Sequence, residues 1–444
     1  MRNFYSLLSA VLLTVLFPYI SFSNNNSVFS DTSATNPPNI VFILIDDMGW
    51  DVFGNYPDIT GIKASTPHID ALTRDGITFL NFWTNPVCAP TRASLLTGKY
   101  SFRTGVGGVQ TTPPSVLDSK EIIIQKYIKD KTNDKYATAL IGKWHLSSRN
   151  DLTAPENFGI NYFSGLMSGG VSDYYDWTQI TNGVQGKKTT YITTELVNNS
   201  INWIKEQNKP FFLWLALNAP HTPFHRPPLN LIKDQSLSDN TAFINTNKYT
   251  YYLAAIEAMD KEIGRLIASL TPAQKENTVF IIMGDNGTPR QVAQKPYTAN
   301  GTKGTLFQGG INTPFIISGK NVNRKNAIEN SLVQAQDLFP TFASIAGIET
   351  SKYQDGISIT PLFNRAIDIN RTFVYTEQFG HANSRMDGYT IRNKDYKLIH
   401  LDNGTEYLYK INTDPFEKVN LLTNILTTDA QENLNQLKVY KANL

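Results

Sequence analysis

The chain has 444 residues, of which 41% are hydrophobic and 18% charged, and this composition excludes a disordered, collagen-like or coiled-coil protein. Its 40 Lys and Arg residues nearly balance 38 Asp and Glu residues, so a net charge of +2 gives no basic surface for nucleic acid. A single Cys excludes an internal disulfide framework and any Cys-rich zinc or iron–sulfur site.

Residues 1–23 have the pattern of a cleaved export signal. Arg2 supplies a positive charge, an apolar stretch runs from Leu7 to Ile20, and Ser21-Phe22-Ser23 has the small-x-small pattern of a cleavage site. The stretch is shorter than the ~20 apolar residues of a membrane span, so we expect a periplasmic or secreted protein without a membrane anchor. Residues 24–38, rich in Asn, Ser, Thr and Pro, are expected to form a flexible lead-in.

Four apolar runs, each followed at once by a polar cluster, predict buried strands: Asn39–Ile45, Tyr136–Ile141, Phe211–Leu217 and Thr278–Met283. Continuous apolar runs of this length fit a parallel sheet covered by helices on both faces. A helix is predicted over Pro67–Asp75, with Thr66 as N-cap and Gly76 as C-cap, and a longer one from Tyr249 onward. The alternation predicts an α/β fold with a large mixed, mostly parallel sheet flanked by helices.

From about Arg371 the pattern changes to short strands separated by turn signals. These strands are predicted over Thr372–Glu377, Tyr389–Arg392, Tyr396–Leu401 and Glu406–Ile411. They predict a smaller C-terminal antiparallel sheet, with a terminal helix after Asp429. We therefore expect an α/β domain over residues 39–360 and an α+β subdomain over residues 361–444.

The polar clusters that follow the four strands are expected to form one site. They contain Asp46 and Asp47, Lys143 and His145, His221, and Asp285 and Asn286. In open α/β sheets the ligand crevice lies at the carboxyl ends of the strands, where all four clusters would emerge.

Residues 88–98 (CAPTRASLLTG) place Cys88 just before a helix whose first turn contains Pro90. The N–H groups at that helix terminus favour an anion, and Arg92 adds a guanidinium group. An isolated Cys is more often a buried structural residue than a reactive one. The local pattern alone therefore leaves the role of Cys88 open.

The Cys-x-Pro-x-Arg pattern followed by Ala-Ser-Leu-Leu-Thr-Gly resembles the signature of type I sulfatases, in the alkaline-phosphatase-like superfamily. Other segments resemble further motifs of that family, in the same order: Asn39–Gly49, Gly142–Leu146, Asn218–Phe224, Gly284–Gly287, Gly301–Gly304 with Gly309-Gly310, and Asp414–Glu417 with Asn420. Gly284 departs from the family, which usually has Ser there. Each motif is short, but the ordered set is specific.

The resemblance implies that a maturase converts Cys88 to Cα-formylglycine (3-oxoalanine), and that residue 88 and four side chains bind calcium: Asp46, Asp47, Asp285 and Asn286. These four offer only oxygen ligands, which suits a hard cation.

The resemblance also implies roles for the basic residues. Arg92 would hold the formylglycine hydrate, which attacks sulfur. His221, with Lys303, would protonate or stabilise the leaving alcohol, and His145 would help to expel sulfate. Lys143 and Lys303 would bind the sulfate group.

Substrate specificity is expected from loops around the site. Candidates are the segment Ser164–Trp177, which contains Tyr174, Tyr175 and Asp176, together with His225-Arg226 and Gly380–Arg385. Trp177 or a Tyr could stack on a sugar ring, and Arg226 or Arg385 could bind a uronate or a second sulfate. Ordinary loop packing is the simpler explanation for each of them.

We therefore expect an exported sulfatase that acts on a sulfated polysaccharide or oligosaccharide, either of algal type, such as ulvan or carrageenan, or a host glycosaminoglycan. Two alternatives stay open. One is a phosphate or phosphonate ester hydrolase of the same superfamily, and the other is a non-catalytic protein that binds sulfated glycans.

Overall fold

The computed structural model describes residues 37–54, 61–109, 116–297, 301–380 and 386–444. The predicted signal peptide and most of the predicted lead-in lie outside these residues. Within them, ten strands form one sheet in the order β11-β2-β10-β9-β1-β8-β4-β5-β6-β7. The five central strands, β9 (Thr278–Gly284), β1 (Asn39–Asp46), β8 (Phe211–Pro220), β4 (Ala137–Lys143) and β5 (Tyr162–Leu166), are all parallel.

The outer strands make the sheet mixed. On one side lie β10 (Phe315–Gly319), β2 (Gly76–Phe79) and β11 (Ala327–Glu329), with β10 antiparallel to both of its neighbours. On the other side β6 (Trp177–Thr181) and β7 (Val184–Lys188) form a hairpin. Short pairs join β3 (Phe82–Trp83) to β12 (Val333–Gln334) and β13 (Lys352–Tyr353) to β14 (Gly356–Ile357). The predicted large, mostly parallel sheet is confirmed.

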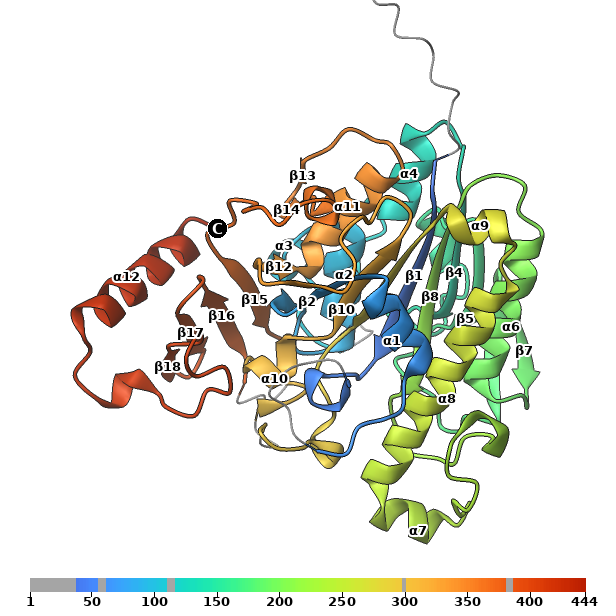
Figure 1. The fold of residues 1–444 in the computed structure, drawn as a ribbon, viewed down its shortest axis with the longest axis horizontal. Helices are drawn as coiled ribbons and strands as arrows, with labels where there is room; N and C mark the ends of the chain where they lie inside the picture. The colour runs from blue at the N-terminus through green and yellow to red at the C-terminus, as the bar shows by residue number, and fades with distance from the viewer. Residues whose placement is uncertain (1–36, 55–60, 110–115, 298–300, 381–385) are drawn as a thin grey trace, which may run out of the picture. The chain divides into compact units, whose positions relative to one another are not determined.

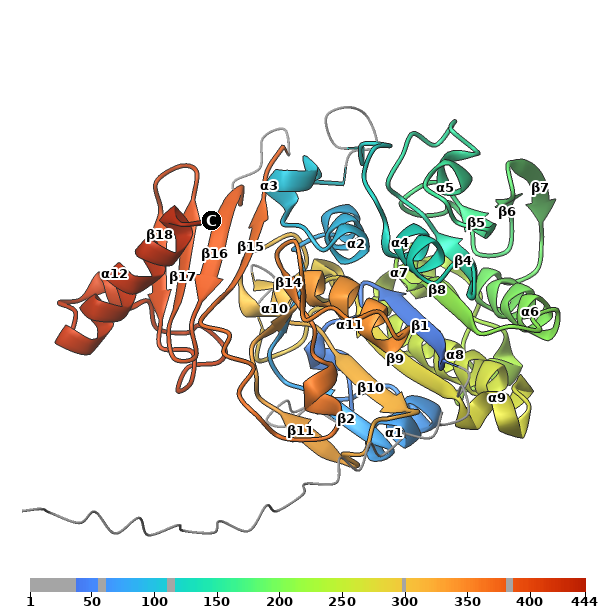
Figure 2. The ribbon, with the colours of Figure 1, turned by 90° about the horizontal axis from the view of Figure 1, so that it is seen from above.

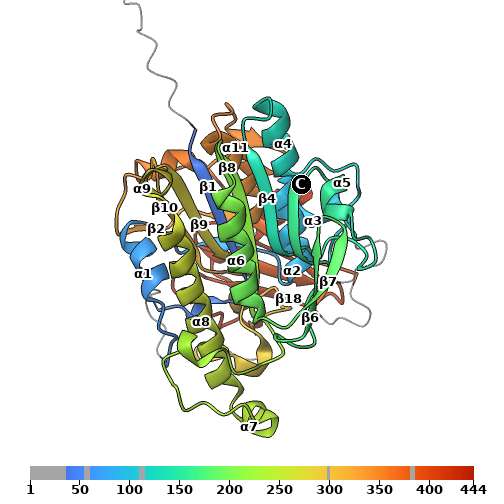
Figure 3. The same cartoon turned by 90° about the vertical axis from the view of Figure 1, so that its right-hand side faces the viewer.

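Helices cover both faces of the sheet because its central strands are apolar on both faces. In β1, Ile40, Phe42 and Leu44 enter one hydrophobic cluster, and the residues between them enter the other. One face is covered by α2 (Cys88–Thr97), α4 (Ile124–Lys131) and α11 (Leu338–Ile345). The other is covered by α1 (Pro67–Arg74), α6 (Ile192–Lys205) and α8 (Lys248–Ser269), as Figures 2 and 3 show.

Shorter helices connect these layers: α3 (Ser101–Thr104), α5 (Ala154–Asn157), α7 (Thr241–Thr246), α9 (Pro272–Glu276) and α10 (Gln308–Ile311). In the described residues, no helix combines the length and the hydrophobicity needed to cross a lipid bilayer.

The prediction that Gly76 caps the first helix is wrong. Helix α1 ends at Arg74, and Gly76 begins β2, where it pairs with Ser318 of β10. A Cβ at position 76 would lie 2.1 Å from the carbonyl oxygen of Ile317, so this glycine allows close strand contact rather than a helix end.

The C-terminal antiparallel sheet is confirmed, with the order β15 (Val374–Gln378), β16 (Gly388–Arg392), β17 (Lys397–Leu401) and β18 (Glu406–Tyr409). Helix α12 (Thr428–Ala442) follows it and buries Leu434 and Leu437 in the same cluster as Leu398 and Leu408. Figure 1 shows this sheet and helix in orange and red, beside the large sheet. The division at residue 360 stays a prediction.

Candidate active site

Four adjacent strands of the large sheet deliver the candidate residues to one edge. In the sheet order β9-β1-β8-β4, the strand ends lead to Asp285, Asp46, His221 and Lys143. Because these strands are parallel, their carboxyl ends lie together. The structure thus brings together clusters that lie up to about 240 residues apart in sequence.

Two buried cations and one partly exposed cation each contact a buried carboxylate. Lys143 Nζ lies 2.7 Å from Asp46 Oδ2, and Arg92 Nη2 lies 2.9 Å from Asp285 Oδ2, with all four side chains fully buried. The ammonium group of Lys303 contacts Asp47 Oδ1. Three positive and three negative groups therefore balance, as buried charges require.

These contacts shift the acidities of the carboxyl groups. Burial alone would raise the pKa of Asp46, but the nearby positive groups, with Lys143 the largest contributor among them, together outweigh burial and hold that pKa below its usual value. For Asp285, burial and the neighbouring Asp46 carboxylate raise the pKa, even though Arg92 opposes them. The charged form of Asp285 is thus less favoured than the charged form of Asp46. A cation bound between these carboxylates would favour the charged form of both.

Two oxygen atoms fit the expected cation. Asp46 Oδ1 and Asn286 Oδ1 are buried and have no hydrogen-bond partner among the described residues. Ligand atoms of Asp46, Cys88 and Asp285 lie within 4.8 Å of one another, and so do those of Asp46, Asp47 and His221. Orphaned carboxylate and amide oxygens in such a cluster fit a hard cation such as calcium.

Cys88 lies at the first turn of α2 and is only 2% exposed. Its Sγ is 3.2 Å from His145 Nδ1. Burial raises the pKa of the Cys88 thiol, although Lys143 and Lys303 oppose the shift. The unmodified thiol is therefore a poor source of thiolate, which is the nucleophilic form of Cys.

Arg92 lies one helical turn after Cys88 and is fully buried. Its Nη1 donates to the backbone oxygen of Lys143 over 2.7 Å, in addition to its contact with Asp285. The guanidinium group therefore connects α2 to the ends of β4 and β9, and it stays fixed beside residue 88.

Each candidate histidine has one ring nitrogen bound to a backbone carbonyl. His145 Nε2 lies 3.2 Å from the oxygen of Val109, and because a carbonyl only accepts, Nε2 carries the proton and Nδ1 faces Cys88 as an acceptor. Burial and the charge of Lys143 lower the pKa of His145 well below its usual value. His145 is therefore a neutral imidazole that can accept a proton.

His221 has the opposite tautomer. Its Nδ1 donates to the backbone oxygen of Thr222 over 2.8 Å, and its Nε2 lies 3.7 Å from Asp47 Oδ2. The Nε2 atom thus faces the acidic group. The geometry allows His221 to hold a proton for a leaving group.

These residues line a cavity of about 540 Å³ that includes Asp47, Cys88, His145, His221 and Lys303. The volume falls within the ~300–1,000 Å³ of small-molecule sites. Asp46, Arg92, Lys143 and Asp285 lie behind this lining and are fully buried. The arrangement therefore presents residue 88, two imidazoles and an ammonium group to a ligand, above a layer of paired charges.

Comparisons with known proteins agree with this geometry. The family model described as Sulfatase matches residues 38–348, which is more than half of the chain. The chain belongs to the sulfatase family. A second model, described as N-sulphoglucosamine sulphohydrolase, C-terminal, matches residues 302–442 and thus covers the smaller sheet.

Among relatives in this family, N-acetylgalactosamine-6-sulfatase of Sus scrofa is 27% identical over 366 residues, covering 74% of this chain and 66% of the relative. Arylsulfatase J of Mus musculus is 26% identical over 333 residues, covering 71% of this chain and 53% of the relative. The chain therefore spans two thirds or less of the length of these two relatives.

A similar solved structure is the crystal structure of Ps i-CgsB in complex with k-i-k-neocarrahexaose. It has a TM-score of 0.76 and 25% identity, and the match covers 91% of this chain and 93% of that chain. The likeness therefore extends over both sheets.

Two residues predicted to bind substrate do not line the cavity of this sulfatase-family chain. His225 stacks on Tyr174 with ring centroids 3.7 Å apart, and its two nitrogens contact Tyr191 Oη and the backbone oxygen of Pro223. Burial lowers the pKa of His225 to about 4, so it is a neutral packing residue. The geometry gives no support for substrate binding by this histidine.

Arg226 is also engaged elsewhere. Its guanidinium group lies 3.0 Å from Asp239 Oδ2 and 3.3 Å from the backbone oxygen of Leu237, and the residue does not line the cavity. Arg385, another candidate, lies outside the described residues.

Two aromatic residues of the candidate loop Ser164–Trp177 make hydrogen bonds within the protein instead of facing the Cys88 cavity. Tyr174 donates to the backbone oxygens of Asn218 and His221, which fixes the segment that carries His221. Trp177 donates to the oxygen of Thr190, and its ring is buried, so it offers no stacking face to the Cys88 cavity.

The sequence missed several residues of the cavity wall. Gly169 packs against His145, because a Cβ at this position would lie 2.5 Å from the ring. Gly170 lies less tightly against His221, where a Cβ would be 3.2 Å from the ring. Arg290 and Gln291 also line the cavity, and both are exposed. In the sequence, the features that could have indicated these wall residues are the Gly169-Gly170 pair and Arg290, five residues after Asp285.

Proposed function

We propose that this protein is a sulfatase that hydrolyses sulfate monoesters on a sulfated polysaccharide or oligosaccharide. The observation that carries the proposal is one cavity lined by residue 88, two imidazoles and the Lys303 ammonium group, with two further cations and two orphaned oxygens buried around it. A sulfate ester needs positive charge around its oxygens and a proton donor for its leaving group.

The proposal includes a bound calcium ion and a modified residue 88. Asp46, Asp47, Asp285 and Asn286, with residue 88, would hold a calcium ion, which would supply positive charge for the sulfate oxygens. Cys88, once converted to formylglycine by a maturase, would supply an aldehyde hydrate as nucleophile. The buried, poorly acidic thiol supports this proposal, because it is a weak nucleophile as it stands.

The protein residues would then divide the work by position. Arg92, fixed by Asp285 and the Lys143 carbonyl, would hold residue 88 in place. Neutral His145, with Nδ1 facing residue 88, would accept a proton there. His221 and Lys303 would donate to or stabilise the leaving oxygen from the open side of the cavity.

The substrate class rests on the relatives. An N-acetylgalactosamine-6-sulfatase is similar in sequence, and a similar solved structure contains a neocarrahexaose. Both names indicate sugars, so we propose a sulfated glycan of algal type or a glycosaminoglycan. We also propose that the protein acts after export to the periplasm or beyond, because residues 1–23 have the pattern of an export signal.

The direct test compares matched esters on protein produced together with a formylglycine-generating maturase. The sulfate monoester of one alcohol should be hydrolysed faster than its phosphate monoester and the related phosphonate ester. Faster hydrolysis of either phosphorus ester would favour the alternative hydrolase. Tight binding of sulfated oligosaccharides with no turnover of any ester would favour the glycan-binding alternative.

A further inference from the structure

A second cavity, of about 420 Å³, lies between the edge of the large sheet and the C-terminal sheet. Its walls come from the segment after β2, from α10, from the turn between β16 and β17, and from the segment after β18. Among the described residues it shares no lining residue with the Cys88 cavity. None of the proposed catalytic steps uses it.

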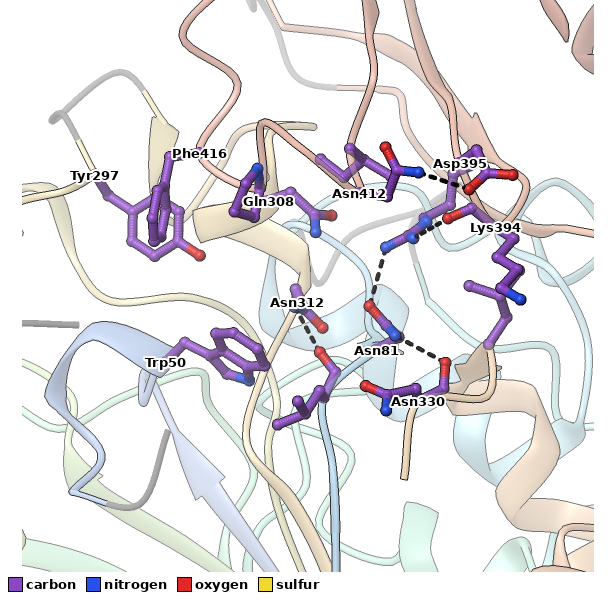
Figure 4. A pocket seen from close by; sticks show the side chains of 15 residues that line it. Trp50, Asn81, Tyr297, Gln308, Asn312, Asn330, Lys394, Asp395, Asn412 and Phe416 are labelled. Carbon is purple, nitrogen blue, oxygen red and sulfur yellow. Dashed lines mark hydrogen bonds between the residues drawn. The ribbon is translucent and has the colours of Figure 1, made fainter. Parts of the chain in front are cut away.

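One side of this cavity is aromatic. Tyr297 and Phe416 pack edge to face with ring centroids 5.6 Å apart, and Trp50 lines the same side (Figure 4). Aromatic faces of this kind offer an apolar surface next to polar groups. The C–H face of a sugar ring is a ligand that combines both properties.

The opposite side is polar and rich in amides. Figure 4 shows Asn81, Asn330, Lys394 and Asp395 there, with Asn312 between the two sides. Asn312 is 2% exposed and donates to the backbone oxygen of Leu80 over 3.0 Å. Its Oδ1 is buried and has no hydrogen-bond partner within the described parts of the chain. A ligand hydroxyl that reaches this oxygen would satisfy it.

Arg392 supplies a buried positive charge. Its guanidinium group donates to Asn81 Oδ1 and to the backbone oxygens of Asn393 and Lys394, at 3.0–3.1 Å, and all three acceptors are neutral. These bonds use three of the five N–H groups of an arginine. Burial lowers the pKa of Arg392 to about 10, which reflects the cost of keeping this charge away from water.

The charge balance of the cavity favours an anion. Arg392 and Lys394 contribute two positive charges, against one from Asp395, whose carboxylate accepts from Asn412 Nδ2 over 2.7 Å. Lys394 is exposed and has no ion pair among the residues that the structure describes. A planar guanidinium group next to a flexible ammonium group suits a sulfate or a carboxylate.

We propose that this cavity is a second saccharide-binding site, which takes a sugar unit carrying a sulfate or a carboxylate group. The saccharide part of the proposal rests on the proposed function, since a polysaccharide in the Cys88 cavity carries further anionic units nearby. Trp50 lies three residues after Asp47, so the Cα atoms of these two residues are at most about 11 Å apart. The site would hold the polymer while one of its sulfate esters occupies the Cys88 cavity.

The test measures binding to protein carrying Cys88→Ala, which needs no turnover. The probes are dextran sulfate, an oligogalacturonate and neutral dextran, measured by calorimetry. Lys394→Glu and, separately, Phe416→Ala should weaken binding of an anionic probe about tenfold, which corresponds to ~1.4 kcal/mol. The matched control is Lys352→Glu, because Lys352 is exposed and lines neither cavity.

The sulfated and carboxylated probes distinguish the two anions by which of them the variants weaken more. The proposal is wrong if Lys394→Glu weakens binding no more than Lys352→Glu does, if neutral dextran binds as well as the charged probes, or if no probe binds at millimolar concentration. Unchanged thermal unfolding of the variants would exclude misfolding as the cause. Hydrolysis of 4-nitrophenyl sulfate by matured protein should be unaffected by Lys394→Glu, so a failure of the proposed function would show there and not in the binding data.

Discussion

The two imidazoles of the cavity differ in which nitrogen faces the reaction site. In His145, Nε2 donates its proton to the backbone oxygen of Val109, and Nδ1 faces residue 88. In His221, Nδ1 donates to the backbone oxygen of Thr222, and Nε2 faces Asp47. The difference matches a division into a base and an acid. These orientations fit the proposed roles of His145 as base and His221 as acid.

His221→Ala separates these roles. A sugar alkoxide leaves only with a proton, whereas an activated phenolate leaves without one. The substitution should therefore reduce kcat/KM for a sugar sulfate by about 10²–10⁴, and that for an aryl sulfate much less. Steady-state kinetics on both esters is the measurement. Equal losses on the two substrates would assign His221 to sulfate binding instead, and Lys303 would become the better candidate for the acid.

At the scale of elements, the loop after β5 holds both histidines in place through its glycines. A methyl group at position 169 would collide with His145, whereas one at position 170 would be 3.2 Å from His221, a contact that a small shift relieves. Gly169→Ala should therefore lower kcat at least about 10²-fold, as a ~1 Å displacement of a catalytic group does. Gly170→Ala is the matched control and should lose less. Comparable losses in the two variants, or a large drop in melting temperature, would contradict this explanation.

Helix α1 begins without the side-chain cap that its sequence predicts. Thr66 occupies the N-cap position but makes no capping hydrogen bond, and Asp260 of α8 instead accepts from the N–H groups of His68 and Ile69, at 3.1 and 2.8 Å. Burial raises the pKa of Asp260 to about 6, even though these hydrogen bonds favour the charged form. One carboxylate thus joins two helices on the same face of the sheet.

This raised pKa makes stability depend on pH. Below pH 4 the carboxyl group is protonated in both folded and unfolded chains, but between pH 4 and 6 the unfolded chain releases its proton first. The free energy of unfolding should therefore fall with rising pH in this window, by roughly 3 kcal/mol at most, at ~1.4 kcal/mol per pKa unit. Urea unfolding of wild type and Asp260→Asn at several pH values measures the effect, since the variant lacks the slope. Parallel curves for the two proteins would contradict it.

At the scale of the whole molecule, the proposed calcium ion joins residues from the ends of β1 and β9. Calcium should raise the melting temperature, by an amount that corresponds to about 2.7 kcal/mol at a hundred times its Kd. Asp46→Ala should abolish this response, because Asp46 Oδ1 is one of the two orphaned oxygens. Thermal unfolding with calcium and with a chelator is the measurement. If exhaustive chelation changed neither the melting temperature nor the activity of the wild-type protein, the calcium proposal would be wrong.

The sequence predicts the parts of the molecule that depend on local patterns. Buried strands followed by polar residues identify β1, β4, β8 and β9 and thereby the candidates Asp46, Lys143, His221 and Asp285. Other residues can be assigned a role only when their contacts in the folded chain are known. His225 resembles a ligand-binding histidine in sequence, but it is packed between Tyr174 and Tyr191.

The second cavity could not be predicted for the same reason. Its lining residues come from segments between positions 50 and 416. Pro415 and Phe416 lie in the motif Asp414–Glu417, but that motif does not indicate that the distant segments meet around a cavity. The Gly169 contact is also invisible in sequence, because it depends on how the loop after β5 lies against β4. Patterns within one segment can identify strand ends, whereas contacts between distant segments require the fold.

The proposed activity depends on conversion of residue 88, because the modified residue would be the nucleophile that attacks the sulfate ester. The most direct measurement follows sulfate release from a sulfated oligosaccharide in samples with different degrees of maturation, together with the mass of the peptide that contains residue 88. We expect the rate to be proportional to the converted fraction and to vanish when only the free thiol is present. Full activity in a sample whose residue 88 is entirely unmodified cysteine would contradict it.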